Sequence, residues 1–159
     1  MPQPVRYKFT QRFSQPARKT YEWCTDFMPE DQALMQKKNA TREVQQFTKN
    51  TIILTDKFHN KGETTVKKKL VCLYPDKLMW TSTHLTGPAK HSQFIYEITS
   101  VNKTASSLRF TALHIAHDIK EGTDKPGANH LAEQLRLEDS TTWKKLAKEM
   151  EKELGTGRL

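Results

Sequence analysis

The pattern of hydrophobic positions changes its period three times along the chain. Near the N-terminus apolar and polar residues alternate, which predicts a half-buried strand that ends before Pro16. From Ala17 to Met28 the apolar residues recur at helical spacing, and Pro16 suits the first turn of such a helix. The acidic residues that follow Pro29 predict a second short helix, which ends near Asn39.

Strand-like alternation then takes over the middle of the chain. From Thr41 to about Ile119, alternating segments separated by turn residues predict six further strands. Asn60-Lys61-Gly62 is typical of a hairpin turn between two of them. After Pro126-Gly127 the helical period returns and continues to Gly155, a natural stop. A helix of about 27 residues would be about 40 Å long, enough to cross the whole sheet.

Two segments carry a resemblance to a known family. Residues 13–26, with the sequence FSQPARKTYEWCTD, are similar to the opening signature of the helix-grip superfamily: a strand, a Pro-Ala step into the first helix, then an aromatic residue and an aspartate. Residues 143–151 are similar to its closing helix. This superfamily, of SRPBCC type, includes the birch-pollen-allergen-like proteins, the START lipid-transfer domains and the polyketide cyclase/dehydrase group.

The resemblance covers nearly the whole chain and implies an α+β helix-grip fold. That fold is a curved seven-stranded antiparallel sheet wrapped around a long C-terminal helix, with two short helices after the first strand. We therefore expect residues 1–159 to form a single ligand-binding domain. The motifs are short, so they indicate a superfamily and no particular substrate, and fold alone does not imply function.

A strongly bent sheet is not filled by one helix, and the remaining space favours an apolar guest if apolar side chains line it. The alternation assigns nine residues to the inner face: Tyr7, Phe9, Leu54, Phe58, Leu70, Trp80, Phe94, Tyr96 and Phe110. Leu131 and Leu135 face them from the helix. Any one of these residues could simply pack against its neighbours. As a set they predict binding or transfer of a lipid, isoprenoid, quinone or aromatic polyketide-like compound. We expect the turn at residues 60–62 and the loop at residues 122–128 to control access.

Polar residues in the same phase suggest a second hypothesis, a cyclase- or dehydratase-type enzyme acting in the same cavity. His84, His114 and Tyr96 are the catalytic candidates, because an inward imidazole or phenol can act as an acid or base. An inward histidine is more often hydrogen-bonded and inert, so whether the chain is an enzyme stays open. Asp56 also points inward, and Lys68 on the next strand is the partner that we expect for it.

Three polar residues, Glu138, Asp139 and Thr142, interrupt the apolar stripe of the long helix. They indicate a bend, a polar cavity mouth or a solvated turn. His114 and His117 do not predict a metal site, because residues three apart in a strand point to opposite faces. No Gly-rich phosphate loop, paired-cysteine metal motif or nucleophile elbow is present, and we expect no cofactor.

The net charge of +8 admits a third hypothesis, a basic surface that binds an anionic membrane or nucleic acid. The basic residues are spread along the chain, with Lys67-Lys68-Lys69 as the densest run, so a solvated surface is the simpler interpretation. An anionic membrane surface remains an alternative partner, and nucleic acid is disfavoured. The absence of a secretory signal, of a bilayer-spanning apolar run and of a disulfide framework predicts a cytoplasmic location. The sequence does not indicate the oligomeric state.

Overall fold

The computed structural model describes residues 2–27, 39–117 and 125–155. Seven strands form one antiparallel sheet in the order β1-β7-β6-β5-β4-β3-β2. The strands are β1 (Gln3–Phe13), β2 (Ala40–Thr48), β3 (Thr51–Asn60), β4 (Glu63–Tyr74), β5 (Met79–His84), β6 (Gln93–Asn102) and β7 (Ala105–Ala116). The helices are α1 (Ala17–Cys24), the short 3₁₀ helix η1 (Pro75–Lys77) and α3 (Lys125–Leu154). The predicted seven-stranded curved sheet with a long C-terminal helix is confirmed.

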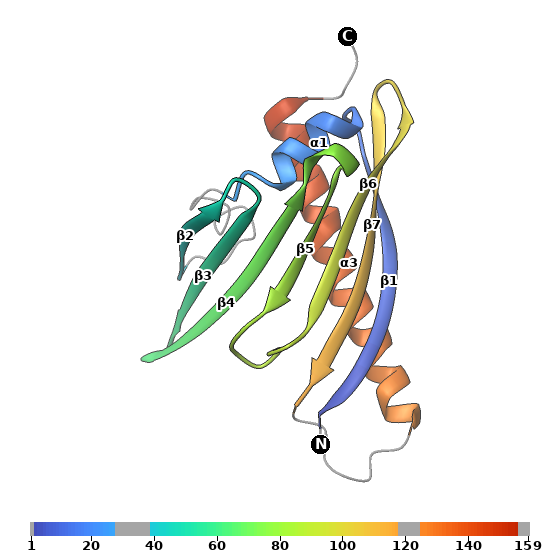
Figure 1. Ribbon diagram of the computed structural model, residues 1–159. Helices are drawn as coiled ribbons and strands as arrows, with labels where there is room; N and C mark the ends of the chain where they lie inside the picture. Colours follow the sequence, from blue (N-terminus) through green and yellow to red (C-terminus); the bar gives the residue numbers. More distant parts are fainter. Residues whose placement is uncertain (1, 28–38, 118–124, 156–159) are drawn as a thin grey trace.

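The sheet bends around α3, as Figure 1 shows. Helix α3 packs most closely against β1 at one edge of the sheet. Strands β2, β3 and β4 form the other side of the curve and extend away from the helix in Figure 1. The inner face of the sheet is therefore covered unevenly by α3.

The predicted hairpin turn lies between β3 and β4. Lys61 and Gly62 adopt φ angles of 48° and 83°, both in the left-handed region. Two consecutive residues with positive φ are typical of the tight turn whose twist matches that of the flanking strands. A Cβ at Gly62 would contact nothing, so the positive φ, and not a lack of space, is what favours glycine here.

Helix α3 begins at Lys125 and has 30 residues, so it starts earlier than the sequence predicted. Pro126 and Gly127 lie in its first turn, where a proline costs no backbone hydrogen bond. The prediction that residues 122–128 form a loop is therefore wrong from residue 125 onward. Residues 118–124 and the second short helix predicted after Pro29 lie outside the described residues.

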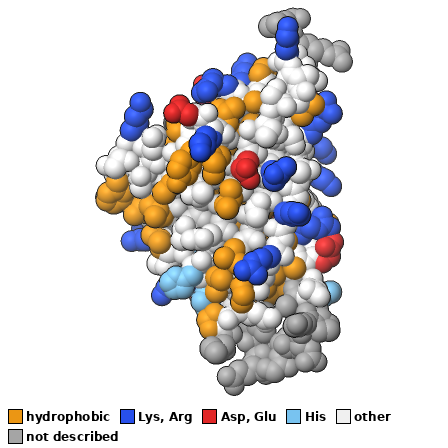
Figure 2. All heavy atoms as spheres, turned by 45° about the vertical axis from the view of Figure 1, so that its right-hand side comes forward, with side chains coloured by type: hydrophobic (Ala, Val, Ile, Leu, Met, Phe, Trp, Pro, Cys, Tyr) orange, Lys and Arg blue, Asp and Glu red, His pale blue; other side chains and the backbone are white. Residues whose placement is uncertain are grey.

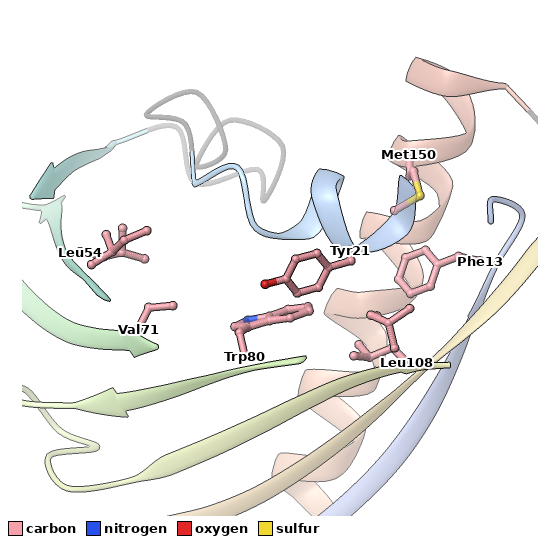
Figure 3. Packing of buried hydrophobic residues seen from close by; sticks show 9 residues of the cluster. Phe13, Tyr21, Leu54, Val71, Trp80, Leu108 and Met150 are labelled. Carbon is pink, nitrogen blue, oxygen red and sulfur yellow. The ribbon is translucent and has the colours of Figure 1, made fainter. Parts of the chain in front are cut away.

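A hydrophobic cluster fills the end of the molecule where α1 and the C-terminal half of α3 meet the sheet, as Figure 3 shows. Its buried members are Phe13, Tyr21, Ile52, Leu54, Val71, Trp80, Ile98, Leu108 and Met150. Two buried polar contacts hold the helices in place. The Thr20 and Ser106 hydroxyls share a hydrogen bond of 2.7 Å, and the Gln15 amide donates to the Gly155 carbonyl. This end of the sheet is thus closed, and the candidate site lies beyond it.

Candidate ligand-binding site on the inner face of the sheet

Strand pairing aligns aromatic side chains across the inner face. Phe9 pairs with Phe110, Phe110 with Tyr96, and Tyr96 with Trp80. The rings of Phe9 and Phe110 stack with centroids 4.6 Å apart, and so do those of Tyr96 and Trp80. Trp143 of α3 completes the group, with its ring centroid 5.8 Å from that of Tyr96. We call these five residues the aromatic row.

The next row of the sheet carries a smaller hydrophobic cluster. Tyr7, Ala112 and Phe94 are neighbours on β1, β7 and β6, and all three are buried. We call these three residues the Tyr7 cluster. Leu135 packs against this cluster from α3. The inner face is therefore aromatic where α3 covers it, and the helix contributes only a few side chains to each row.

Exposure divides the inward-facing residues into two groups. Leu54, Trp80, Phe94 and Phe110 are 2–7% exposed and belong to the packed interior. The predicted site residues that are only half-buried are Phe9, Phe58, Tyr96, His114, Leu131 and Leu135. An apolar side chain that faces the interior yet keeps accessible surface is not fully covered by the side chains around it. The half-buried group therefore marks where a guest could make contact.

Leu70 does not belong to this face, and its prediction as an inner residue is wrong. It pairs with Thr83, whereas Lys69 and Val71 pair with the inward His84 and Ser82. Since successive side chains of a strand point to opposite faces, Leu70 lies on the outer face. Val71, only 1% exposed, occupies the inner position instead.

A polar pair joins the helix to the first strand. The Tyr7 hydroxyl donates a hydrogen bond to Asp139 of α3. Burial and the Asp139 carboxylate raise the pKa of Tyr7 above its usual range, and burial followed by Asp139 does the same for the pKa of Tyr96. Asp139 therefore faces the sheet, as the cavity-mouth interpretation of residues 138–142 requires. Glu138 is exposed, and its carbonyl accepts a hydrogen bond from Thr142.

A charged group lies on the inner face of β2, β3 and β4. Asp56 is completely buried and accepts hydrogen bonds from Arg42 at 2.7 and 3.1 Å, while Lys69 Nζ lies 3.5 Å from the same carboxylate. Burial alone would raise the pKa of Asp56, but Arg42 and Lys69 outweigh it and hold that pKa below its usual value. The expectation that Lys68 is the partner is wrong, because Lys68 pairs with the outward Thr55.

Lys67 extends this group. It pairs directly with Asp56, so its side chain lies on the same face, and its Nζ lies 5.1 Å from the centroid of the Phe58 ring. We call Arg42, Lys67 and Lys69 the inner basic group. None of the three was predicted from the sequence to face inward. The one indication in the sequence is that Lys67 and Lys69 alternate in the same phase as Val71, whereas Leu70 has the opposite phase.

His84 pairs with Lys69 and adjoins this group. Burial, reinforced by Lys69, Lys67 and His114, lowers its pKa to about 3, so the imidazole is neutral at physiological pH. Its Nδ1 is buried and makes no hydrogen bond with any described residue. The structure thus places His84 and His114 within electrostatic range of each other, whereas the third catalytic candidate, Tyr96, lies near Tyr7 and Asp139.

The low pKa of His84 predicts a pH-dependent stability. The unfolded chain binds a proton at this residue near pH 6.5, whereas the folded protein binds it only near pH 3. The free energy of unfolding should therefore fall as the pH drops through that window, by up to about 1.4 kcal/mol per pH unit. Urea unfolding at pH 7 and pH 5 measures the slope. We expect His84→Gln to flatten it and the exposed control His59→Gln to keep it. An unchanged slope in His84→Gln would contradict the assignment.

Lysine and arginine side chains are spread over the face drawn in Figure 2, with a few acidic side chains among them. Among the described residues, no group of three or more histidine, cysteine or acidic side chains could hold a metal ion. None of the helices described is long and apolar enough to cross a membrane.

Comparison with solved structures identifies the fold. The Zhui aromatase/cyclase from Streptomyces sp. R1128 superposes with a TM-score of 0.74 at 14% identity, over 96% of each chain. A START superfamily protein from Mycobacterium smegmatis gives 0.66 at 11% identity, over 92% of this chain and 99% of that one. Norcoclaurine synthase from Thalictrum flavum, in complex with dopamine and hydroxybenzaldehyde, gives 0.66 at 10% identity, over 92% and 86% of the two chains. The chain therefore has the helix-grip fold. No protein-family model matches the sequence, and comparison with curated protein sequences finds no relative.

Proposed function

We propose that this helix-grip protein binds a hydrophobic small molecule between the inner face of its sheet and α3. The observation that carries the proposal is the set of inward-facing apolar side chains that remain half-buried. Phe9 and Tyr96 of the sheet, and Leu135 of α3, keep accessible surface although they face the interior. An apolar guest that covered this surface would be stabilised by about 25 cal/mol for each square ångström removed from water.

The solved structures support the size and kind of guest. Norcoclaurine synthase was solved with two aromatic small molecules, and the Zhui protein is an aromatase/cyclase. Aromatic guests also suit the aromatic row of this chain, because offset-stacked and edge-to-face ring contacts add about 0.5–1.5 kcal/mol beyond the burial of area. We therefore expect an aromatic or polycyclic apolar molecule to bind better than a straight alkyl chain of equal area.

The direct test is titration with the uncharged fluorophore N-phenylnaphthylamine, together with native mass spectrometry of the purified protein. We expect saturable binding of one fluorophore per chain. Leu135→Trp should fill the space next to the Tyr7 cluster and weaken binding at least about tenfold, a loss of about 1.4 kcal/mol. Leu137→Trp is the matched control, because Leu137 is 59% exposed on the same helix, and its binding should not change.

Two outcomes would contradict the proposal. One is the absence of saturable N-phenylnaphthylamine binding to the folded protein, and the other is an equal loss in both tryptophan variants. Circular dichroism before each titration confirms that the variants are folded. A co-purifying apolar mass, released by solvent extraction, would support the proposal independently.

A second candidate function, acid–base catalysis on the bound guest, has one observation in its favour. The neutral imidazole of His84 lies beside Lys69 on the inner face, and His114 is within electrostatic range of it. A neutral imidazole has a free nitrogen that can accept a hydrogen bond or a proton from a bound guest. The test is mass spectrometry of the extracted ligand before and after incubation with the protein and with His84→Gln. A mass change that disappears in the variant while N-phenylnaphthylamine binding persists would favour an enzyme.

A further inference from the structure

The inner basic group has no role in binding a purely apolar guest. Arg42, Lys67 and Lys69 lie on the inner face of β2 and β4, on either side of Leu54 and half-buried Phe58 of β3. Lysine and arginine are rarely placed inside a protein, because removing their charge from water is costly unless a partner compensates. The placement of three basic side chains on the inner face therefore needs an explanation.

Stabilisation of the fold explains only part of the arrangement. Asp56 binds Arg42 and Lys69, so one carboxylate faces two cations. Lys67, which pairs directly with Asp56, adds a third positive charge on the same face, where its Nζ lies over the Phe58 ring. Two rows of paired residues cross the inner face here. One consists of Val44, Leu54, Lys69 and His84, and the other of Arg42, Asp56 and Lys67. Asp56 is the only acidic residue in either row. Among the described residues these rows carry excess positive charge.

A polar atom without a partner lies at the same place. The buried Nδ1 of His84 makes no hydrogen bond with the described residues, although His84 pairs with Lys69. A buried polar atom without a hydrogen bond destabilises the protein, and a ligand atom that bonded to it would remove that cost. The ring of His84 also lies 5.0 Å from that of Phe94, which belongs to the Tyr7 cluster. The polar position and the apolar surface are therefore contiguous.

From this arrangement we infer that the ligand is an amphiphile with an anionic group. Its apolar body lies along the aromatic row, and its carboxylate, sulfonate or phosphate reaches Lys67 and Lys69 beside His84. The inference rests on the proposed function, since it assigns the head group of the molecule bound at that site. Charge-assisted hydrogen bonds from two ammonium groups hold the anion, and the low-dielectric surroundings strengthen them.

The test compares two fluorophores with the same aromatic skeleton. Anilinonaphthalene sulfonate carries an anionic group, and N-phenylnaphthylamine lacks it. We expect the protein to bind the sulfonate at least about tenfold more tightly. Lys67→Met should remove most of this preference while leaving the affinity for N-phenylnaphthylamine within about twofold. Lys68→Met is the matched control, because Lys68 is exposed on the outer face of the same strand and the variant loses the same charge.

Competition for the bound sulfonate identifies the source of the anion. Dodecanoate and dodecyl phosphate should both displace it better than dodecanol, and their order assigns a carboxylate or a phosphate head group. Equal displacement by dodecanol, or equal losses in Lys67→Met and Lys68→Met, would overturn the inference while leaving the apolar site intact. Failure of both fluorophores to bind would instead contradict the proposed function itself. Retained N-phenylnaphthylamine affinity shows that each variant is folded.

Discussion

Replacement of Asp56 by alanine is expected to lower the free energy of unfolding by about 3–5 kcal/mol at pH 7. The carboxylate is completely buried and binds Arg42, whose side chain is only 7% exposed, and Lys69 at 23%. Without Asp56 these cations would be close together with no described acidic neighbour in their rows. An uncompensated buried charge costs more than the original pair contributed. Urea unfolding followed by circular dichroism measures the change.

Glu43→Ala is the matched control for this prediction. Glu43 follows Arg42 on β2 and is exposed, so its removal should change the free energy of unfolding by no more than about 0.5 kcal/mol. A loss below about 1 kcal/mol in Asp56→Ala would contradict the buried network. The double variant Arg42→Met/Asp56→Ala should be less destabilised than the sum of the two single variants, because each single change leaves a charge without its partner.

The same network makes the difference between the wild type and Asp56→Ala depend on pH. The pKa of Asp56 in the folded protein lies below the ordinary value of 3.8. The contribution of the carboxylate is therefore fully present well above pH 3.8 and is lost as the pH falls through the lower folded value. The stability gap between the two proteins should be constant from pH 7 to pH 5 and should narrow below about pH 4. A gap that stays constant to pH 2 would contradict the assigned direction.

The fold could be predicted because its determinants are local. The change from a two-residue to a helical period separates the strands from α1 and α3, and turn residues mark the ends of the strands. Lys61 and Gly62 show this most directly, since the two positive φ angles needed by the hairpin coincide with a glycine-containing turn. Pro126 misled the prediction at the other end, because a proline suits either a loop or the first turn of a helix.

The site was harder to predict from the sequence, because the pairing between strands decides which residues face inward. On β4, apolar residues occupy both phases: Leu70 and Cys72 in one, Val71 and Leu73 in the other. Alternation within that strand therefore cannot decide which set faces inward. The register with β3 decides it, since Lys67 pairs with buried Asp56. Once that pair is fixed, Leu70 must face outward and Lys69 inward.

The contact between Tyr7 and Asp139 illustrates a further limit. The two residues are 132 positions apart in the sequence, and no residue next to either of them indicates that they are in contact. The sequence showed only that Asp139 interrupts an apolar stripe. Whether a polar residue in that stripe faces solvent or the sheet depends on the strand that packs against the helix. That strand is β1, at the far end of the chain.

Trp80→Ala is expected to lower the free energy of unfolding by about 3–5 kcal/mol. Trp80 is 3% exposed, its ring is parallel to that of Tyr96 within 3°, and Tyr21 contacts it edge-on at 5.9 Å. Trp143 of α3 contacts both Trp80 and Tyr96. Removal of the indole therefore leaves a cavity beneath α1. It also removes the ring contacts that link Tyr21, at the closed end of the molecule, to Tyr96 and Trp143. Urea unfolding measures the loss.

The near-ultraviolet circular dichroism spectrum distinguishes the stacking of Trp80 on Tyr96 from the packing of an ordinary core residue. Stacked Trp80 and Tyr96 should contribute strongly to the spectrum, and Trp80→Ala should remove that contribution. Trp23→Ala is the control: the Trp23 indole donates a hydrogen bond of 3.1 Å to the Glu153 carboxylate near the surface, so its loss should cost less. Because Tyr96 belongs to the aromatic row, Trp80→Ala should also weaken N-phenylnaphthylamine binding under conditions where the variant is still folded. Unchanged binding would mean that the fluorophore does not contact the aromatic row, whatever the variant does to stability.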